Sequence, residues 1–305
     1  MKKKKRKKYV GFALLFLLGL SILLYPTFSD AWNQYRNAKL ITTYDTAVKD
    51  LPDMEYDRLW KEAKEYNKKH TANIFTDAFD EKGNYVLDNE YKKVLDPDGE
   101  GVMGSIEIPK IQVRIAIYHG LSDDVLEKGA GHVEGTSLPV GGKNTHAVLA
   151  AHRGLPSAKL FTDLDQMEVG DTFLLHILGK TLAYKVDQIK TVLPSETDEL
   201  NIIKGEDHVT LLTCTPYGVN THRLLVRGIR TKYVEQKTEK NETVPQKLAQ
   251  VEPKKIMGAG LAAFGILLVL LIVFIHYKDK KIVISKSNKE ARHNEKKEQK
   301  KKSIQ

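Results

Sequence analysis

Cys214 is the only cysteine among the 305 residues, and it ends a short β-branched and apolar run, residues 210–214. The next four residues, Thr-Pro-Tyr-Gly, are typical of a turn. A single thiol forms neither an intramolecular disulfide nor a metal site built from several cysteines, so any chemistry it performs is that of a nucleophile. The alternative interpretation is a buried cysteine that packs as a small apolar side chain.

A cysteine nucleophile needs a base or acid, and His152 is the best candidate. It stands at the end of an apolar run and at the start of a loop that contains Gly154 and Pro156. His146 begins the same apolar run, and His222 precedes an arginine, but histidines in such places are more often structural or exposed. Residues 29–255 contain eight histidines, so counting does not make the partner unique: His70, His119, His132, His146, His152, His176, His208 and His222.

An arginine could stabilise the negative charge that develops during acyl transfer. Arg223 and Arg227 follow Cys214 on the next predicted strand and share one face of it, but they lie about 13 Å apart at about 3.3 Å per residue. In a hairpin with the cysteine strand, Arg223 is nearer to the turn and therefore nearer to the thiol. We interpret Arg227 and Arg230 as solvated or paired with carboxylates.

Two apolar segments flank the central part of the chain. Residues 10–28 follow the basic run Lys2–Lys8, and residues 256–277 contain no charged side chain and precede a lysine-rich tail. At about 1.5 Å per residue, each can cross a hydrocarbon core of about 30 Å. The first could instead be a signal peptide, but its end is a poor cleavage site, so we interpret it as an uncleaved anchor.

The charge distribution predicts the orientation in the membrane. Residues 1–9 carry seven positive charges, residues 278–305 carry a net +7, and residues 29–255 carry a net −5. The positive-inside rule therefore predicts both ends in the cytoplasm and the central part outside. The overall +9 gives no support to nucleic-acid binding. An outside domain without cysteine pairs fits a bacterium with a single membrane.

The central part changes character along its length. Residues 29–70 predict two helices, with Ser29 or Asp30 as the first cap and a break at Leu51-Pro52. Residues 71–103 form a connection, residues 104–232 are rich in strands, and residues 233–255 read as a polar linker. Short strands punctuated by Gly and Pro, with one helix at 122–128, favour a mostly antiparallel barrel. The predicted strands are 106–108, 113–117, 147–150, 172–177, 182–192, 209–213 and 223–229.

Three ordered blocks then resemble one family. Residues 210–223, Thr-Leu-Leu-Thr-Cys-Thr-Pro-Tyr-Gly-Val-Asn-Thr-His-Arg, resemble the TLxTC…R signature of sortases. Residues 151–165, which begin Ala-His-Arg-Gly-Leu-Pro, are similar to the histidine segment of class C, pilin-polymerising sortases of Gram-positive bacteria. Residues 104–111 resemble the segment that opens the sortase barrel. Two membrane spans and an N-terminal extension are also similar to class C enzymes.

The resemblance implies a closed eight-stranded sortase-type β barrel with N-terminal helices and two transmembrane helices. It implies that Cys214, His152 and Arg223 are catalytic, and that no metal or organic cofactor is needed. The implied reaction cleaves an LPXTG-like sorting signal of a pilin, forms a thioester and transfers it to a lysine amine of another pilin. A membrane-tethered cysteine hydrolase, a cell-wall-anchoring sortase and a non-enzymatic assembly scaffold stay open as alternatives.

Class C sortases also often carry a lid, an Asp-Pro-aromatic segment that lies over the cysteine. Here the best match is Asp77-Ala78-Phe79, with alanine in place of proline. The resemblance implies a lid in which Asp77 anchors the loop and Phe79 covers the thiol. The alternative is an ordinary turn with a packed phenylalanine.

Overall fold

The computed structural model describes residues 2–69, 79, 88–233, 273 and 277. The chain divides into two compact units, residues 24–250 and the two ends, residues 1–23 with 251–305. The helices are α1 (Lys2–Lys49), α2 (Asp53–Lys69) and α3 (Asp123–Leu126), with single 3₁₀ turns η1 (Tyr91–Lys93), η2 (Pro109–Ile111), η3 (Leu164–Gln166) and η4 (Asp198–Leu200). The strands are β1 (Val102–Ile108), β2 (Val113–His119), β3 (Ala130–His132), β4 (Thr145–Ala150), β5 (Thr172–Ile177), β6 (Lys180–Val192), β7 (Asp207–Thr215) and β8 (His222–Thr231).

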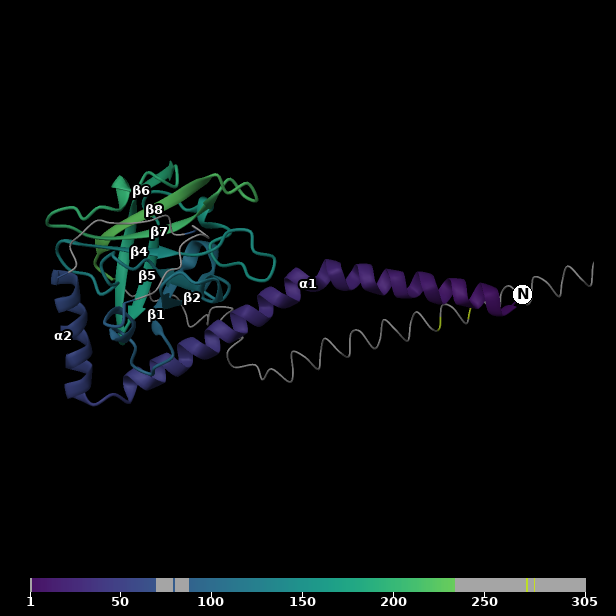
Figure 1. The fold of residues 1–305 in the computed structure, drawn as a ribbon, viewed down its shortest axis with the longest axis horizontal. Coiled ribbons are helices and arrows are strands. Elements are labelled where there is room, and N and C mark those ends of the chain that lie inside the picture. The colour runs from purple at the N-terminus through teal and green to yellow at the C-terminus, as the bar shows by residue number, and fades with distance from the viewer. Residues whose placement is uncertain (1, 70–78, 80–87, 234–272, 274–276, 278–305) are drawn as a thin grey trace, which may run out of the picture. The chain divides into compact units, whose positions relative to one another are not determined.

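The eight strands close into a barrel, as predicted (Figure 1). Their order around the barrel is β1-β2-β3-β4-β7-β8-β6-β5. Most neighbours are antiparallel, but β2 pairs with β3, and β4 with β7, in parallel. The parallel pair β4–β7 matters for the site, because the C-terminal ends of both strands reach the same rim of the barrel. The sequence prediction missed β3, a three-residue strand with a glycine at its centre, which is too short to show alternation.

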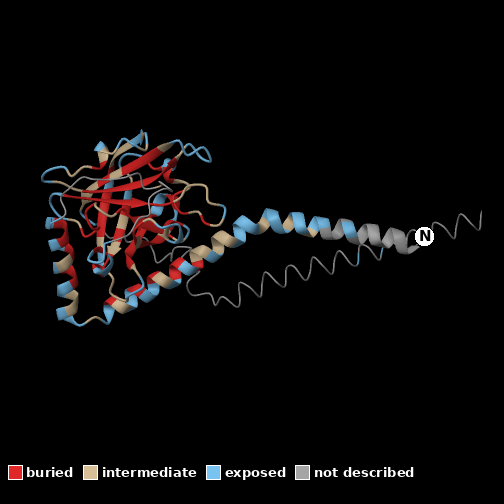
Figure 2. Cartoon of the chain, viewed as in Figure 1, coloured by how far each residue is buried: buried red, intermediate tan, exposed pale blue. Residues whose placement is uncertain are grey.

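Apolar side chains from every strand fill the barrel interior. Figure 2 shows that much of the strand backbone belongs to buried residues. The aromatic rings of Phe173 and Tyr184 stack at 5.7 Å between β5 and β6, and both side chains are fully buried. A second, smaller cluster lies at the rim near the end of β4 and contains Val148, Ala150 and Leu212. Ala150 and Leu212 of this cluster lie two residues before His152 and Cys214, so the cluster borders the predicted site.

The helix α1 is continuous, so the prediction of a separate helix capped by Ser29 or Asp30 is wrong. Pro26 lies inside α1, and no glycine follows that would end the helix at this point. The Asp30 carboxylate is used in tertiary contacts instead of a cap: it accepts hydrogen bonds from the Lys159 backbone N–H and from Gln34 Nε2, both at 2.7 Å. The predicted break at Leu51-Pro52 is confirmed, because α2 begins at Asp53.

Within the described residues, one helical segment, Leu15–Lys49, is long and apolar enough to cross a membrane, judged by length and composition. Its N-terminal part exposes large apolar side chains, among them Leu15, Phe16 and Ile22 (Figure 2). This segment overlaps the predicted anchor, residues 10–28. The second predicted span, residues 256–277, lies outside the described residues except for positions 273 and 277, so the two-span arrangement stays a prediction.

Polar side chains fasten the helices to the barrel. Tyr44 of α1 donates its hydroxyl hydrogen to the Met103 carbonyl and accepts the Leu178 N–H, at 2.8 and 3.0 Å. Asn67 of α2 exchanges two hydrogen bonds with the Leu138 backbone. Because these bonds satisfy buried backbone groups that no strand pairs, they fix where each helix lies on the barrel.

Candidate active site

Cys214 lies near the C-terminal end of β7, where its side chain is 7% exposed. In the antiparallel pair β7–β8, Cys214 stands directly opposite Arg223. Opposite residues of a strand pair point to the same face of the sheet, so the thiol and the guanidinium share one side of the barrel wall. The predicted pairing of the cysteine strand with the arginine strand is therefore confirmed.

His152 reaches the same place from the other neighbour of β7. The parallel register of β4 and β7 pairs Ala150 with Leu212, and the next backbone bond, Ala151 N–H to the Leu212 carbonyl at 3.2 Å, continues it. Two residues beyond Ala150, the chain brings His152 level with Cys214. The Thr213 hydroxyl donates to the Ala151 carbonyl at 2.7 Å and holds this register just before the histidine.

Burial lowers the pKa of His152, while the carboxylates of Asp123 and Glu127 oppose that shift. Desolvation favours the neutral imidazole, which can accept a proton, and the two carboxylates favour the imidazolium, which can donate one. A histidine under both influences is suited to acid and base steps near neutral pH.

Arg223 is 8% exposed, and its own loop orients it. Its Nη1 donates to the carbonyl oxygens of Asn220 and His222, at 3.0 and 3.2 Å. The guanidinium carbon lies 5.2 Å from the centre of the Phe79 ring, within cation–π distance. The charged group is thus held at the rim, next to the thiol strand.

Phe79 connects the two polar candidates. Its ring centre lies 5.7 Å from that of His152, and the ring packs against the apolar cluster that contains Ala150 and Leu212. Phe79 therefore contacts the residues that flank Cys214 on both sides. Asp77, the predicted anchor of the lid, lies outside the described residues.

The alternative histidines are placed elsewhere. His146 is buried, donates from Nδ1 to the Asn201 carbonyl at 2.9 Å and accepts from the Thr210 hydroxyl at 2.7 Å. His222 pairs with Thr215, one position away from the Cys214–Arg223 pair, so its side chain points to the opposite face of the sheet. Neither is arranged as the partner of the thiol.

The structure also places the other two arginines of β8. Arg227 forms a forked ion pair with Asp187, in which Nη2 approaches Oδ2 to 2.6 Å. The guanidinium of Arg230 lies over the ring of Tyr184, 5.4 Å from its centre. Arg227 is paired with a carboxylate as predicted, whereas Arg230 stacks on an aromatic ring.

Sequence reasoning missed Arg153, whose guanidinium contacts the last residue of β7, Thr215, and a carboxylate of the following loop, Asp165. Its position directly after His152 was the only available signal. Among the described residues, no group of three or more His, Cys, Asp or Glu side chains could hold a metal ion. The residues brought together at the rim are a thiol, an imidazole and a guanidinium, which suit acyl transfer through a covalent intermediate.

Comparison with known proteins agrees with this fold. A sequence model described as the sortase domain matches residues 106–231. Among solved structures, a sortase C of Streptococcus pneumoniae is 46% identical, with a TM-score of 0.59 over 64% of this chain and 97% of that one. A sortase C1 of Streptococcus agalactiae is 47% identical, with a TM-score of 0.57 over 63% of this chain and 93% of that one.

Curated relatives match over the barrel. Sortase A of Streptococcus agalactiae is 30% identical over 130 residues, 42% of this chain and 52% of that protein. Sortase D of Bacillus subtilis is 29% identical over 142 residues, 46% of this chain and 69% of that protein. The match thus spans about half of the first relative. A closed eight-stranded barrel that matches the sortase domain defines a protein of the sortase type. The chain belongs to the sortase family, and the streptococcal structures that it resembles are class C sortases.

Proposed function

We propose that this protein is a cysteine transpeptidase that polymerises pilins, as expected of a class C sortase. The observation that carries the proposal is the placement of Cys214 on β7 between His152, which follows β4, and Arg223 on β8. The similarity to a sortase C whose structure is described in terms of pilin substrate specificity supports the choice of substrate.

In the first half of the reaction, the Cys214 sulfur attacks the threonine carbonyl carbon of an LPXTG-like sorting signal. A C–S bond forms, the Thr–Gly C–N bond breaks, and the imidazolium of His152 gives its proton to the leaving amine. Arg223 stabilises the negative charge on the carbonyl oxygen during the attack. The product is a thioester between Cys214 and the pilin.

In the second half, a lysine amine of another pilin attacks the thioester. The neutral imidazole of His152 accepts a proton from the attacking amine, a C–N bond forms, and the C–S bond breaks. The thiol is regenerated and the two pilins are joined by an isopeptide bond. The chemistry needs only these side chains and the two substrates.

The test is mass spectrometry of the full-length protein incubated with a sorting peptide. A thioester on Cys214 and, after addition of a lysine-containing acceptor, an amide product would support the proposal. Free acid as the main product in both conditions would indicate a hydrolase, and transfer only to a cell-wall amine would indicate a wall-anchoring sortase. A Cys214→Ala variant that keeps cellular function would point to a scaffold.

We further propose that Phe79 belongs to a lid that opens to admit the sorting signal. Its ring contacts His152 and Arg223, so both residues become more accessible when it leaves. The Asp77 carboxylate is proposed to anchor this segment.

We propose a membrane protein with two spans, both ends in the cytoplasm and the barrel outside. Support comes from the apolar segment within α1 and from the basic flanks of the sequence. On cells without their wall, added protease should degrade the barrel and leave a tag after Lys302 intact. Cleavage of the tag in sealed cells would contradict this orientation.

A further inference from the structure

Arg153 follows His152 directly, in the loop that leads from β4 to β5, and its side chain is 8% exposed. Its guanidinium has partners on two segments, the end of β7 and the later part of its own loop. Nη1 donates to the Thr215 hydroxyl at 3.1 Å, Nε to the Thr162 carbonyl at 3.1 Å and Nη2 to the Asp165 carboxylate at 2.5 Å. Each of the three guanidinium nitrogens therefore has a hydrogen-bond partner.

These contacts complete a symmetrical arrangement around the two reacting side chains. On one side, Ala151 is bonded to Thr213 through the hydroxyl of the threonine. On the other side, Arg153 is bonded to Thr215, again through a threonine hydroxyl. The residues before and after His152 are thus tied to the residues before and after Cys214.

The second tie is needed because the backbone leaves the sheet at this point. The strand β4 ends at Ala150, and Gly154 adopts a left-handed conformation, with φ of 81°. The Gly154 N–H donates to the Thr162 hydroxyl at 3.1 Å, so the loop folds back on itself directly after Arg153. Without the guanidinium, the hydrogen bond between Arg153 and Thr215 would be lost. This is the described side-chain contact that joins the chain after His152 to the end of β7.

We propose that Arg153 is a positioning residue that holds His152 at reacting distance from Cys214, an inference that rests on the proposed transpeptidase function. The planar guanidinium carries donors in a rigid fork, whereas a lysine ammonium is a single point charge on a flexible stem. A lysine would keep the charge and lose the simultaneous contacts to Thr215, Thr162 and Asp165. Misplacement of a catalytic group by about 1 Å can reduce the rate about 100-fold.

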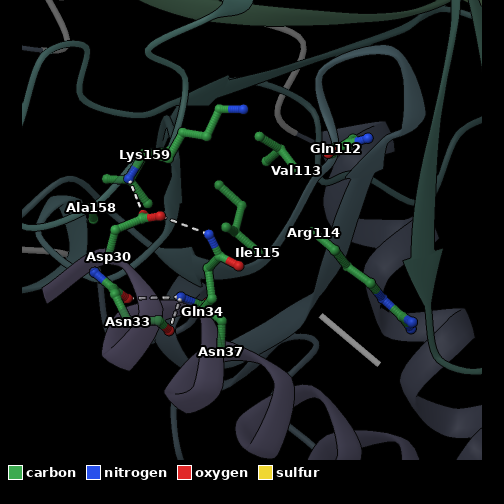
Figure 3. Close-up of a pocket in the computed structure, with 11 residues that line it drawn as sticks. Asp30, Asn33, Gln34, Asn37, Gln112, Val113, Arg114, Ile115, Ala158 and Lys159 are labelled. Carbon is green, nitrogen blue, oxygen red and sulfur yellow. Dashed lines mark hydrogen bonds between the residues drawn. The ribbon is translucent and has the colours of Figure 1, made fainter. Parts of the chain in front are cut away.

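Lys159 provides a matched control in the same loop. Like Arg153, it is a basic side chain with one carbonyl and one carboxylate partner: its Nζ donates to the Ile111 carbonyl at 3.0 Å and pairs with Asp163 at 2.9 Å. Ile111 belongs to η2 and Asp163 to the same loop as Lys159, while the Lys159 backbone N–H donates to Asp30 of α1 (Figure 3). Removing Lys159 therefore loosens the loop without touching the tie to β7.

The experiment compares full-length wild type in detergent with Arg153→Lys, Arg153→Ala, Thr215→Val and Lys159→Ala. One measurement is the single-turnover rate of thioester formation with a sorting peptide, together with KM. The second is the pH dependence of Cys214 alkylation by iodoacetamide. Thermal unfolding is recorded for every variant, and Thr215→Val, which removes one hydroxyl, tests the tie if Arg153→Ala does not fold.

We expect Arg153→Lys and Arg153→Ala to slow thioester formation roughly 10- to 100-fold, with KM changed less than about twofold. Thr215→Val should slow it several-fold, and Lys159→Ala less than about twofold. A displaced His152 stabilises the thiolate less, so the alkylation midpoint should move to higher pH in the Arg153 variants, by a smaller amount in Thr215→Val, and not in Lys159→Ala. The Arg153 variants should unfold at temperatures close to that of Lys159→Ala, although they form the thioester much more slowly.

Wild-type rates in Arg153→Lys would overturn the inference, because the charge would then suffice without the fork. Equal losses in Arg153→Ala and Lys159→Ala would also overturn it, since general loosening of the loop would explain both. If wild type formed no thioester with any sorting peptide, the proposed function would fail. The pH midpoint of Cys214 alkylation, which needs no sorting peptide, would still test whether Arg153 positions His152. An unchanged midpoint in both Arg153 variants would refute the positioning role.

Discussion

At the scale of single residues, the two neighbours of the cysteine strand contribute the side chains that surround Cys214. The spacing between adjacent strands, about 4.8 Å, sets the separation of Arg223 from the thiol, because the two residues are paired. His152 lies two residues beyond the end of β4, the parallel neighbour. A loop alone would hold these groups less firmly. The barrel therefore supplies much of the orientation that acyl transfer requires.

The first prediction concerns these three residues. Cys214→Ala should abolish the thioester, and His152→Ala and Arg223→Ala should each lower kcat/KM by roughly 10²- to 10⁴-fold with the fold intact, because each removes a proton carrier or a charge at the reacting centre. Kinetics with a sorting peptide, together with circular dichroism, measure this. Arg227→Ala is the matched control, since Arg227 lies on the same face of β8 but is paired with Asp187. An inactive, folded His222→Ala beside an active His152→Ala would contradict the assignment.

At the scale of elements, Phe79 is the described part of the proposed lid. Its contact with the Arg223 guanidinium and its packing on the rim cluster together contribute about 1 to 2 kcal/mol. Because 1.4 kcal/mol corresponds to about a tenfold change in an equilibrium, loss of this contact would shift the proposed lid about tenfold towards its open state.

The second prediction follows from this contact. Phe79→Ala should speed the labelling of Cys214 by a bulky maleimide by about five- to thirtyfold, and peptide cleavage should accelerate with it. Stopped-flow labelling measures the rate. The rate for Phe79→Leu, which keeps an apolar side chain, should lie between those of wild type and Phe79→Ala. Iodoacetamide, being small, should distinguish the variants less. Identical maleimide rates in wild type, Phe79→Ala and Asp77→Ala, all folded, would mean that this segment is not a lid.

Several elements could be predicted from local pattern alone. The strands that contain 147–150 and 209–213 are apolar and β-branched runs bounded by turn residues, and the chemistry sits at their ends. The continuity of α1 could not be predicted, because Asp30 is a good cap in isolation and only a contact from Lys159 shows its actual use. The role of Arg153 depends on Thr215, 62 residues away, and no local pattern encodes such a contact.

At the scale of the whole molecule, two buried histidines link the stability of the barrel to pH. Burial is the main reason that the pKa values of His132 and His146 fall to about 4. Each ring is satisfied in its neutral form: His132 donates from Nε2 to the Ser137 carbonyl and accepts from the Tyr91 hydroxyl, both at 2.8 Å. A second proton would have to displace one of these bonds or remain without a partner.

The third prediction is a loss of stability in mild acid. Both pKa values lie below the unfolded value of about 6.5, so the unfolded chain binds more protons than the folded chain between pH 6.5 and 4. Stability is therefore fully present above pH 6.5 and falls as the pH drops towards 4. At about 1.4 kcal/mol per pH unit for each histidine, the free energy of unfolding should fall by about 4 kcal/mol between pH 7.5 and 5.

Urea unfolding of the full-length protein in detergent at a series of pH values measures the slope of the unfolding free energy against pH. The interval from pH 7.5 to 5 isolates the histidines, because carboxylates that gain partners on folding, such as Glu107 beside His176, release their contribution only at lower pH. His146→Gln keeps a donor and an acceptor for the Asn201 carbonyl and the Thr210 hydroxyl but does not titrate, so it should reduce the fall in unfolding free energy by about 2 kcal/mol. His222→Gln, a change on the half-exposed end of β8, should leave the slope unaltered. A slope equal in wild type and His146→Gln would show that this histidine does not carry the acid sensitivity of the barrel.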